Sequence, residues 1–97
     1  ALAAGNPEEA LEHYCYARHT AKTLAEEYGE ADFLPAWLEL DLRIAEIHRL
    51  LDQHDSAAVY AREGLKTLRR NRFPAGMDAF ITKLAFRFMR LLTAVEP

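Results

Sequence analysis

The sequence is poor in the features that mark disulfide-bonded, metal-bound or membrane-embedded proteins. Its 97 residues contain one cysteine, Cys15, so neither an internal disulfide nor a cysteine zinc cluster can form. A lone thiol favours a reducing compartment, and we expect a cytoplasmic protein. No apolar run approaches the roughly 18 residues of a membrane span, and no basic stretch followed by an apolar one marks a signal peptide. We therefore expect no association with a membrane.

Glycine and proline are also scarce, with four of each, so long helices have few interruptions. No segment shows the alternation of a strand bounded by turn residues. Asn6-Pro7 is typical of a helix start, because asparagine caps and proline suits the first helical position. Apolar residues at helical spacing and the turn residues between them predict an all-α chain of about four antiparallel helices, at about 7–28, 35–52, 57–70 and 77–95.

Charge is distributed unevenly along the chain, although the net charge is only −3. Residues 1–61 hold twelve acids against four Lys/Arg, a net −8, and residues 62–97 hold eight Lys/Arg against three acids, a net +5. Two ordinary solvated surfaces would account for this split. The alternatives are an electropositive face for an acidic partner and head-to-tail self-association.

Small residues recur after two comparable turns. The turn at 5–10 precedes Ala17, and the turn at 52–57 precedes Gly64, so each turn ends in a small residue with another seven positions further on. Small residues at this spacing let two helix backbones approach closely, and the large side chains of the neighbour fill the remaining space. We therefore expect Ala57 and Gly64 to lie in close contacts between helices.

These features resemble the tetratricopeptide repeat. In that family a helix with a large–small pair leads through a tight turn into a second helix with spaced small residues, which ends near a proline. Here the corresponding positions are Ala45, the turn at 52–55, Ala57, Gly64 and Pro74. The resemblance implies antiparallel helical hairpins stacked into an α-solenoid.

The spacing of the repeat departs from the family. The two turns begin at residues 5 and 52, which are 47 residues apart, whereas the standard repeat has about 34. Longer repeats of this kind resemble those of bacterial regulators and sensor proteins, and a generic four-helix bundle is the alternative. The register implies fewer than the roughly three repeats that an array needs. We therefore expect residues 1–97 to form a single helical domain cut from a longer array.

The search for catalytic or metal-binding patterns yields no candidate. His13 and His19 are six residues apart, as are His48 and His54, whereas two ligands on one helical face need a spacing of four. His48 lies on an apolar stripe, which is typical of a satisfied boundary histidine. No glycine-rich phosphate loop is present. We expect no metal, no cofactor and no enzymatic activity.

A basic run near the end of the third predicted helix contains Lys66, Arg69, Arg70 and Arg72. Only Phe73 is an adjacent aromatic residue, whereas proteins that bind nucleic acids often combine such a run with several stacking aromatics. Helix C-termini also favour cations without any partner. We therefore do not expect nucleic-acid binding.

The resemblance also implies a function, because in that family the first helix of each repeat lines a groove that holds a peptide or helix of a partner protein. Mixed charges beside a phenylalanine and a methionine suit such a groove, with an apolar anchor and charged selectivity. The alternative is a homo-oligomerisation segment of a bacterial transcription regulator or sensor, for example a homodimer. Carried over by register, the partner-binding residues are Glu39, Leu42, Glu46 and Arg49 of the second helix and Thr82, Phe86, Met89 and Arg90 of the fourth.

The fourth predicted helix has an apolar arc of roughly 140°, whereas one neighbour covers a stripe of somewhat over 100°. We expect something outside the four helices to cover this arc: a second copy, a partner helix or further repeats. The alternative is that the fourth helix folds back across both earlier hairpins and buries the arc internally.

Overall fold

The computed structural model describes residues 6–28, 33–73 and 75–96, and these residues are helical almost throughout. Within this part of the chain there is no strand, which confirms the predicted all-α class with four helices. The predicted boundaries at Gly29 and Pro74 lie outside the described residues. The elements are α1 (Pro7–Tyr28), α2 (Leu34–Leu50), α3 (His54–Arg70), a short 3-10 turn (Ala75–Met77) and α4 (Asp78–Val95).

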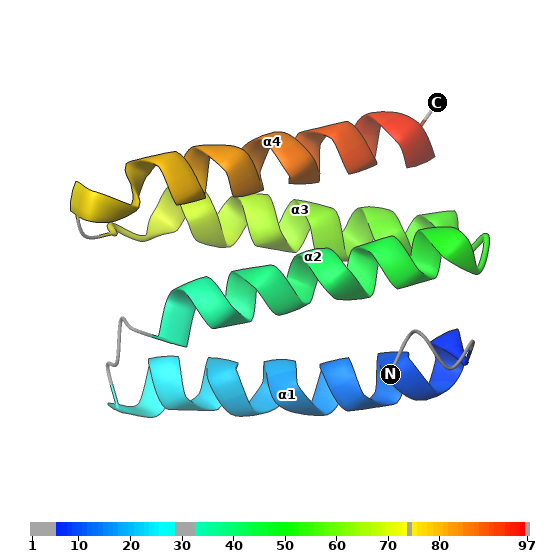
Figure 1. Ribbon diagram of the computed structural model, residues 1–97, viewed down its shortest axis with the longest axis horizontal. Coiled ribbons are helices and arrows are strands. Elements are labelled where there is room, and N and C mark those ends of the chain that lie inside the picture. The colour runs from blue at the N-terminus through cyan, green and yellow to red at the C-terminus, as the bar shows by residue number, and fades with distance from the viewer. Residues whose placement is uncertain (1–5, 29–32, 74, 97) are drawn as a thin grey trace.

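Consecutive helices run in opposite directions and pack as neighbours (Figure 1). α1 packs against α2, α2 against α3, and α3 against α4. α4 also contacts α2, although the two are not consecutive in the chain. As a result, α2 and α4 run in the same direction and share one surface (Figure 1).

The N-terminus of α1 is capped as the sequence predicts. The backbone N–H of Glu9 donates to Oδ1 of Asn6 over 3.1 Å, and Nδ2 of Asn6 donates to Oε2 of Glu9 over 3.2 Å. Pro7 occupies the first helical position, where its missing N–H has no helical partner to lose. This local pairing satisfies one of the N–H groups that every helix start leaves unpaired.

The turn between α2 and α3 is built around Asp52, which has a left-handed backbone with φ of 58°. The N–H of Gln53 donates to the carbonyl oxygen of His48 over 2.8 Å, and that of Asp52 donates to Arg49 over 3.0 Å. These two bonds form a Schellman motif, in which the left-handed position is usually glycine. α3 begins directly after this turn at His54, three residues earlier than predicted.

The main core lies between α2, α3 and α4. Ala45 and Ala57 have no exposed surface, which confirms that small residues lie in the close helix contacts. Gly64 contacts the ring of the fully buried Phe88, and a Cβ added to Gly64 would overlap that ring. The other buried members of this core are Leu38, Leu42, Ala58, Ala61, Leu65, Leu68, Leu84, Leu91 and Val95.

The structure corrects the expectation that something outside the four helices covers the apolar arc of α4. α4 lies against both α3 and α2, so two helices cover its arc rather than one. The arc is therefore buried internally, as in the alternative considered above, but α4 packs on α2 and α3 rather than across both earlier hairpins. Met89, which extends the arc, and Phe86, which lies apart from it, remain exposed. The arc residues are buried (Leu84, Phe88, Leu91, Val95) or partly buried against the core (Phe80, Ile81, Ala85, Leu92).

α1 is attached through a smaller apolar cluster. Ala21 packs with Leu34 and Trp37 of α2, and Ala25 lies at the edge of this cluster. Nζ of Lys22 lies 5.9 Å from the ring centroid of Trp37, a distance at which a cation is attracted to the ring face. The small size of this cluster means that polar contacts carry more of the α1 attachment than they carry in the main core.

Candidate functional site

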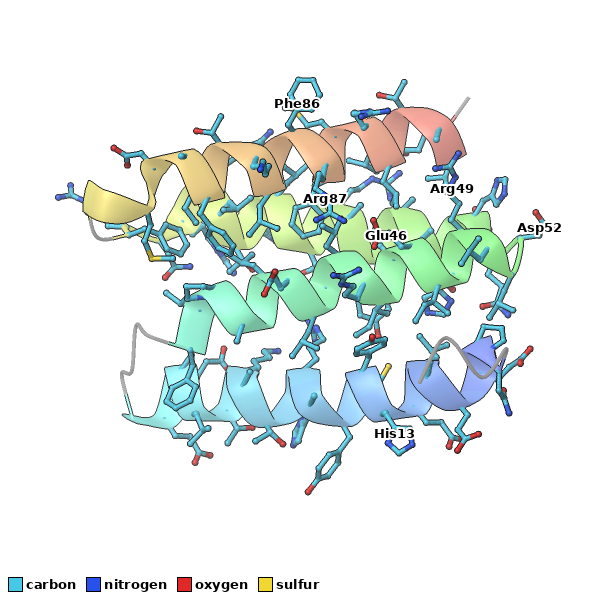
Figure 2. All side chains as sticks on the ribbon, in the orientation of Figure 1. His13, Glu46, Arg49, Asp52, Phe86 and Arg87 are labelled. Atoms are coloured by element: carbon cyan, nitrogen blue, oxygen red, sulfur yellow. The ribbon has the colours of Figure 1, made fainter. Side chains whose placement is uncertain are left out.

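A groove with a volume of about 740 Å³ runs between α2 and α4. Figure 2 shows Glu46 and Arg49 reaching from α2 toward α4, and Arg87 reaching from α4 toward α2. The groove exists because α4 packs mainly against α3 and contacts α2 less extensively. The residues that line it are Arg43, Glu46, Ile47, Arg49 and Leu50 of α2 and Arg87, Arg90, Leu91 and Ala94 of α4.

The floor of the groove is apolar and is fixed by the core. Ile47 and Leu91 are buried, and Leu91 follows Phe88 by one turn of α4. Leu50, by contrast, is 74% exposed. Leu50 is the last residue of α2 and lies on the groove side, where α3 does not cover it. An exposed leucine beside a buried apolar floor is a favourable anchor for an apolar side chain.

The walls of the groove carry an excess of positive charge. Nη2 of Arg87 donates to Oε2 of Glu46 over 3.1 Å, which joins α4 to α2, and Arg43 lies 4.0 Å from the other oxygen of Glu46. Among the described residues, Arg49 and Arg90 have no acidic partner within salt-bridge distance. Four arginines therefore face one glutamate, which leaves three positive charges in excess.

A shallower hollow of about 340 Å³ adjoins the groove on the outer side of α4. It shares Arg90 and Ala94 with the groove and adds Phe86, Met89 and Thr93. Phe86 is 59% exposed and points away from the other helices (Figure 2), and Met89 is 48% exposed. The groove and the hollow thus form one surface with arginines and aliphatic or aromatic side chains. Such a surface presents guanidinium groups, which can pair with anions, beside apolar area.

The structure brings five of the eight predicted partner-binding residues to this surface. Glu46, Arg49 and Arg90 line the groove, and Phe86 and Met89 line the adjoining hollow together with Arg90.

The other three predicted residues lie elsewhere. Glu39 and Thr82 are exposed but line neither the groove nor the hollow. Leu42 was assigned wrongly, because it is 1% exposed and packs in the main core. Leu42 lies on the face of α2 that packs in the main core, whereas the next residue along the helix, Arg43, lines the groove.

Sequence reasoning missed Arg43, Leu50 and Arg87 as groove residues. Arg43 follows Leu42 directly, so at this turn of α2 the predicted groove-facing position was one residue too early. One residue turns a helix by about 100°, enough to exchange a buried face for an exposed one. The sequence did contain a signal that Leu42 is buried, because Leu42 continues the apolar stripe that Leu38 and Ala45 form along α2.

A second charged contact lies between α1 and α2 and was not found from the sequence. Nε of Arg18 donates to Oδ1 of Asp41, which has no exposed surface. The guanidinium of Arg18 also lies 5.5 Å from the ring centroid of Tyr60 on α3. Arg18 therefore joins three helices, although it comes from the helix with the fewest apolar contacts to the core.

Burial governs the ionisation of this contact. It raises the pKa of Asp41 from its ordinary value of 3.8 to about 6, and the opposing effect of Arg18 is smaller. Burial also raises the pKa of Tyr60, and the neighbouring Cys15 raises it further. Oδ2 of Asp41 and Nε1 of Trp37 are both buried without a hydrogen-bond partner among the described residues. These groups lie between helices and do not line the groove, so we assign them to the attachment of α1.

The four histidines do not form a site. His48 is partly buried, stacks on Tyr60 with ring centroids 5.6 Å apart, and its Nδ1 lies 2.7 Å from Oε1 of Gln53. This is the satisfied boundary histidine that the sequence predicted. His13 and His19 are exposed on α1. In the described part of the chain, no group of three or more His, Cys, Asp or Glu residues is placed to hold a metal ion.

None of the described helices combines the length and the apolar character needed to cross a membrane. Compared with protein-family models, curated proteins and solved structures, the chain matches none of them. The function is therefore argued from the groove and its surroundings.

Proposed function

We propose that this chain is a tetratricopeptide-like interaction module that holds a peptide or helix of a partner protein in the groove between α2 and α4. The observation that carries the proposal is the groove itself, with a volume of about 740 Å³, an apolar floor and charged walls. Sites that take small ligands have volumes of roughly 300–1,000 Å³, so there is room for anchoring side chains.

The packing of the helices supports the repeat-like part of the proposal. α2 and α3 form an antiparallel hairpin in which Ala45 and Ala57 are fully buried, and Gly64 of α3 lies against Phe88 of α4. α4 then packs against α3, contacts α2 and runs in the same direction as α2 (Figure 1). In the resembled family, the first helices of two consecutive repeats have this relationship and line the binding groove. α2 and α4 would accordingly be the two first helices.

The composition of the groove supports binding rather than catalysis. Leu50 offers exposed apolar area above the buried floor, and arginine is among the residues most enriched at the energetic centres of protein interfaces. Its guanidinium groups hold carboxylates with two parallel hydrogen bonds, which gives both affinity and orientation. A groove lined by guanidinium groups and aliphatic side chains therefore selects a partner by charge and by an apolar anchor.

Selection from a random peptide library displayed on phage tests this proposal. We expect enriched peptides to bind the wild type and to lose binding to Ala94→Phe, which fills the point where the groove meets the hollow. The matched control is Ala79→Phe, also an exposed alanine on α4 but one that lines neither cavity. If the two variants bound the selected peptides equally, the groove would not be the binding site.

A second candidate function is self-association through the outer side of α4. The observation in its favour is the pair of exposed apolar residues Phe86 and Met89, which line a hollow of their own. Sedimentation velocity distinguishes it, because a homodimer held by this face dissociates when Phe86 and Met89 are replaced with serine. A monomer at all concentrations that still binds selected peptides would leave the groove as the functional surface.

A further inference from the structure

The charge balance of the α2–α4 groove identifies the chemistry of its occupant, provided that the groove holds a partner as proposed above. The single acid, Glu46, is already engaged by Arg87 across the groove and by Arg43 one turn away. The positive charges of Arg49 and Arg90 are not matched by any acid of the described residues within salt-bridge distance. These two arginines line the groove from opposite walls, one on α2 and one on α4.

Apolar side chains lie next to the unmatched charges. Leu50 follows Arg49 directly and is exposed on the α2 wall, and Met89 precedes Arg90 on the α4 side. An anion without apolar groups would leave these side chains in water. A ligand with carboxylates and apolar side chains at neighbouring positions would satisfy both kinds of group at once.

We propose that the occupant is an acidic amphipathic segment of a partner protein. Its carboxylates pair with Arg49 and Arg90, and its apolar side chains pack on Leu50 and on the hollow beside Met89. Arginine suits this role because its planar fork binds a carboxylate through two hydrogen bonds. The groove lining extends over residues 43–50 of α2 and 87–94 of α4, roughly 12 Å of helix length, so a helical segment of about 15 residues spans it with about one turn to spare at each end.

The apolar groups favour such a segment over a nucleic acid. A phosphate backbone is recognised mainly by charge, with aromatic side chains stacking on the bases. The groove lining contains no aromatic residue and the adjoining hollow contains only Phe86, whereas the densest basic run, Lys66 to Arg72, lies at the end of α3 rather than in the groove. A second copy of this chain is the other source of carboxylates, through the exposed Glu8, Glu9 and Glu12 of α1. Sedimentation of the variant described below distinguishes a second copy from a segment of a partner protein.

The experiment is a fluorescence-anisotropy titration with three labelled peptides of about 15 residues. The first carries leucines at helical spacing flanked by glutamates, the second has lysine in place of each glutamate, and the third has serine in place of each leucine. We expect the first peptide to bind at least about tenfold more tightly than either of the others. Arg49→Gln with Arg90→Gln should weaken that binding by about tenfold. The matched control, Arg69→Gln with Arg70→Gln, removes the same charge outside the groove and should change affinity less than about twofold.

Several outcomes would overturn the proposal. Equal affinity for the glutamate and lysine peptides, or unchanged affinity in the Arg49→Gln/Arg90→Gln variant, would show that the groove does not select acidic segments. Equally strong competition by a single-stranded oligonucleotide of matched charge would show recognition of charge alone. Dimers in sedimentation that dissociate in the same double variant would assign the groove to a second copy.

The proposed function and this inference fail in different ways. If library-selected peptides bind the groove but the glutamate–leucine peptide does not, the partner chemistry is wrong and the interaction module stands. If neither kind of peptide binds, both are wrong. Circular dichroism of each variant checks that the fold is intact. We expect no change, because the four substituted residues, Arg49, Arg69, Arg70 and Arg90, are all exposed.

Discussion

Among the described residues, three arginine–acid contacts join neighbouring helices: Arg18 with Asp41, Arg87 with Glu46, and Arg62 of α3 with Glu96 at the end of α4. The first two differ most in burial and in balance. Between α1 and α2, one arginine, Arg18, pairs with one acid, Asp41, which has no exposed surface. Between α2 and α4, four arginines line an open groove with a single acid, Glu46, which contacts only Arg43 and Arg87. The same chemistry is thus used once in a closed one-to-one pair and once in an open groove with excess charge.

The difference teaches how to separate charges that hold a fold together from charges that are available to a partner. A buried charge must be paired, because leaving it alone costs several kcal/mol. An exposed ion pair contributes only about 0–1 kcal/mol, so the excess arginines of the groove add little to stability. We therefore expect substitutions in the two places to affect different measurements.

The largest expected effect comes from Arg18→Met, which keeps the apolar stem but leaves Asp41 without its partner. We expect the free energy of unfolding to fall by about 2–4 kcal/mol, because the carboxylate must stay unpaired or become protonated. Urea unfolding measures the loss, and hydrogen exchange should show that α1 amides lose protection first. The matched control is Arg49→Met in the groove, with an expected change within about 0.5 kcal/mol. Equal losses in both variants would remove the distinction between the two places.

The next effect tests whether apolar packing, rather than the groove charges, sets the position of α4. Gly64→Ala adds a methyl group that overlaps the ring of Phe88. Alanine favours a helix by about 1 kcal/mol over glycine, but we expect the overlap with Phe88 to cost more than this gain. The free energy of unfolding should therefore fall by about 1–3 kcal/mol. Gly76→Ala is the control, because a Cβ there meets no atom within 4 Å. A Gly64→Ala protein as stable as the wild type would mean that α4 lies further from α3 than described.

The pH dependence of stability examines the buried pair by itself. The folded pKa of Asp41, about 6, lies above its ordinary value of 3.8, so the folded state gains stability when Asp41 is protonated. This contribution is fully present below about pH 4 and is lost as the pH rises through about 6. Relative to Asp41→Asn, the wild type should therefore lose on the order of 2 kcal/mol between about pH 4 and pH 7 in urea unfolding. Parallel pH profiles for the two proteins would contradict the raised pKa.

The smallest effect concerns an acid that belongs to neither place. Asp52 has a left-handed backbone, and its exposed contact with His54 at 3.6 Å contributes little. Glycine adopts this conformation without strain, although it also adds entropy to the unfolded chain. We expect Asp52→Gly to raise the free energy of unfolding by about 0.5 kcal/mol. Asp55→Gly in the first turn of α3 should lower it, since an acid there favours the helix.

The features that could be predicted from the sequence are those decided by neighbouring residues. The cap at Asn6 depends on a residue three positions away, and the role of Gly64 follows from the spacing of small residues along one helix. By contrast, Asp41 resembles any surface acid in the sequence, and only the packing of α1 over it shows that it is buried.

The position of the groove was predicted only in part, for a related reason. Leu42 and Arg43 differ by one step around the helix, and which of them faces the groove depends on where α3 and α4 lie. In the same way, the apolar arc of α4 could not show that α2 covers part of it. Local patterns therefore predict helices and caps, whereas the faces of the helices depend on tertiary packing.

The most direct test of this account measures stability and binding on one variant, Arg49→Gln with Arg90→Gln. We predict that its free energy of unfolding in urea stays within about 0.5 kcal/mol of the wild type, because exposed unpaired arginines add little to the fold. Its affinity for the acidic leucine peptide should fall by about tenfold in the same sample. A loss of stability with unchanged affinity would contradict the account, because it would show that these arginines hold the helices together and do not recognise a partner.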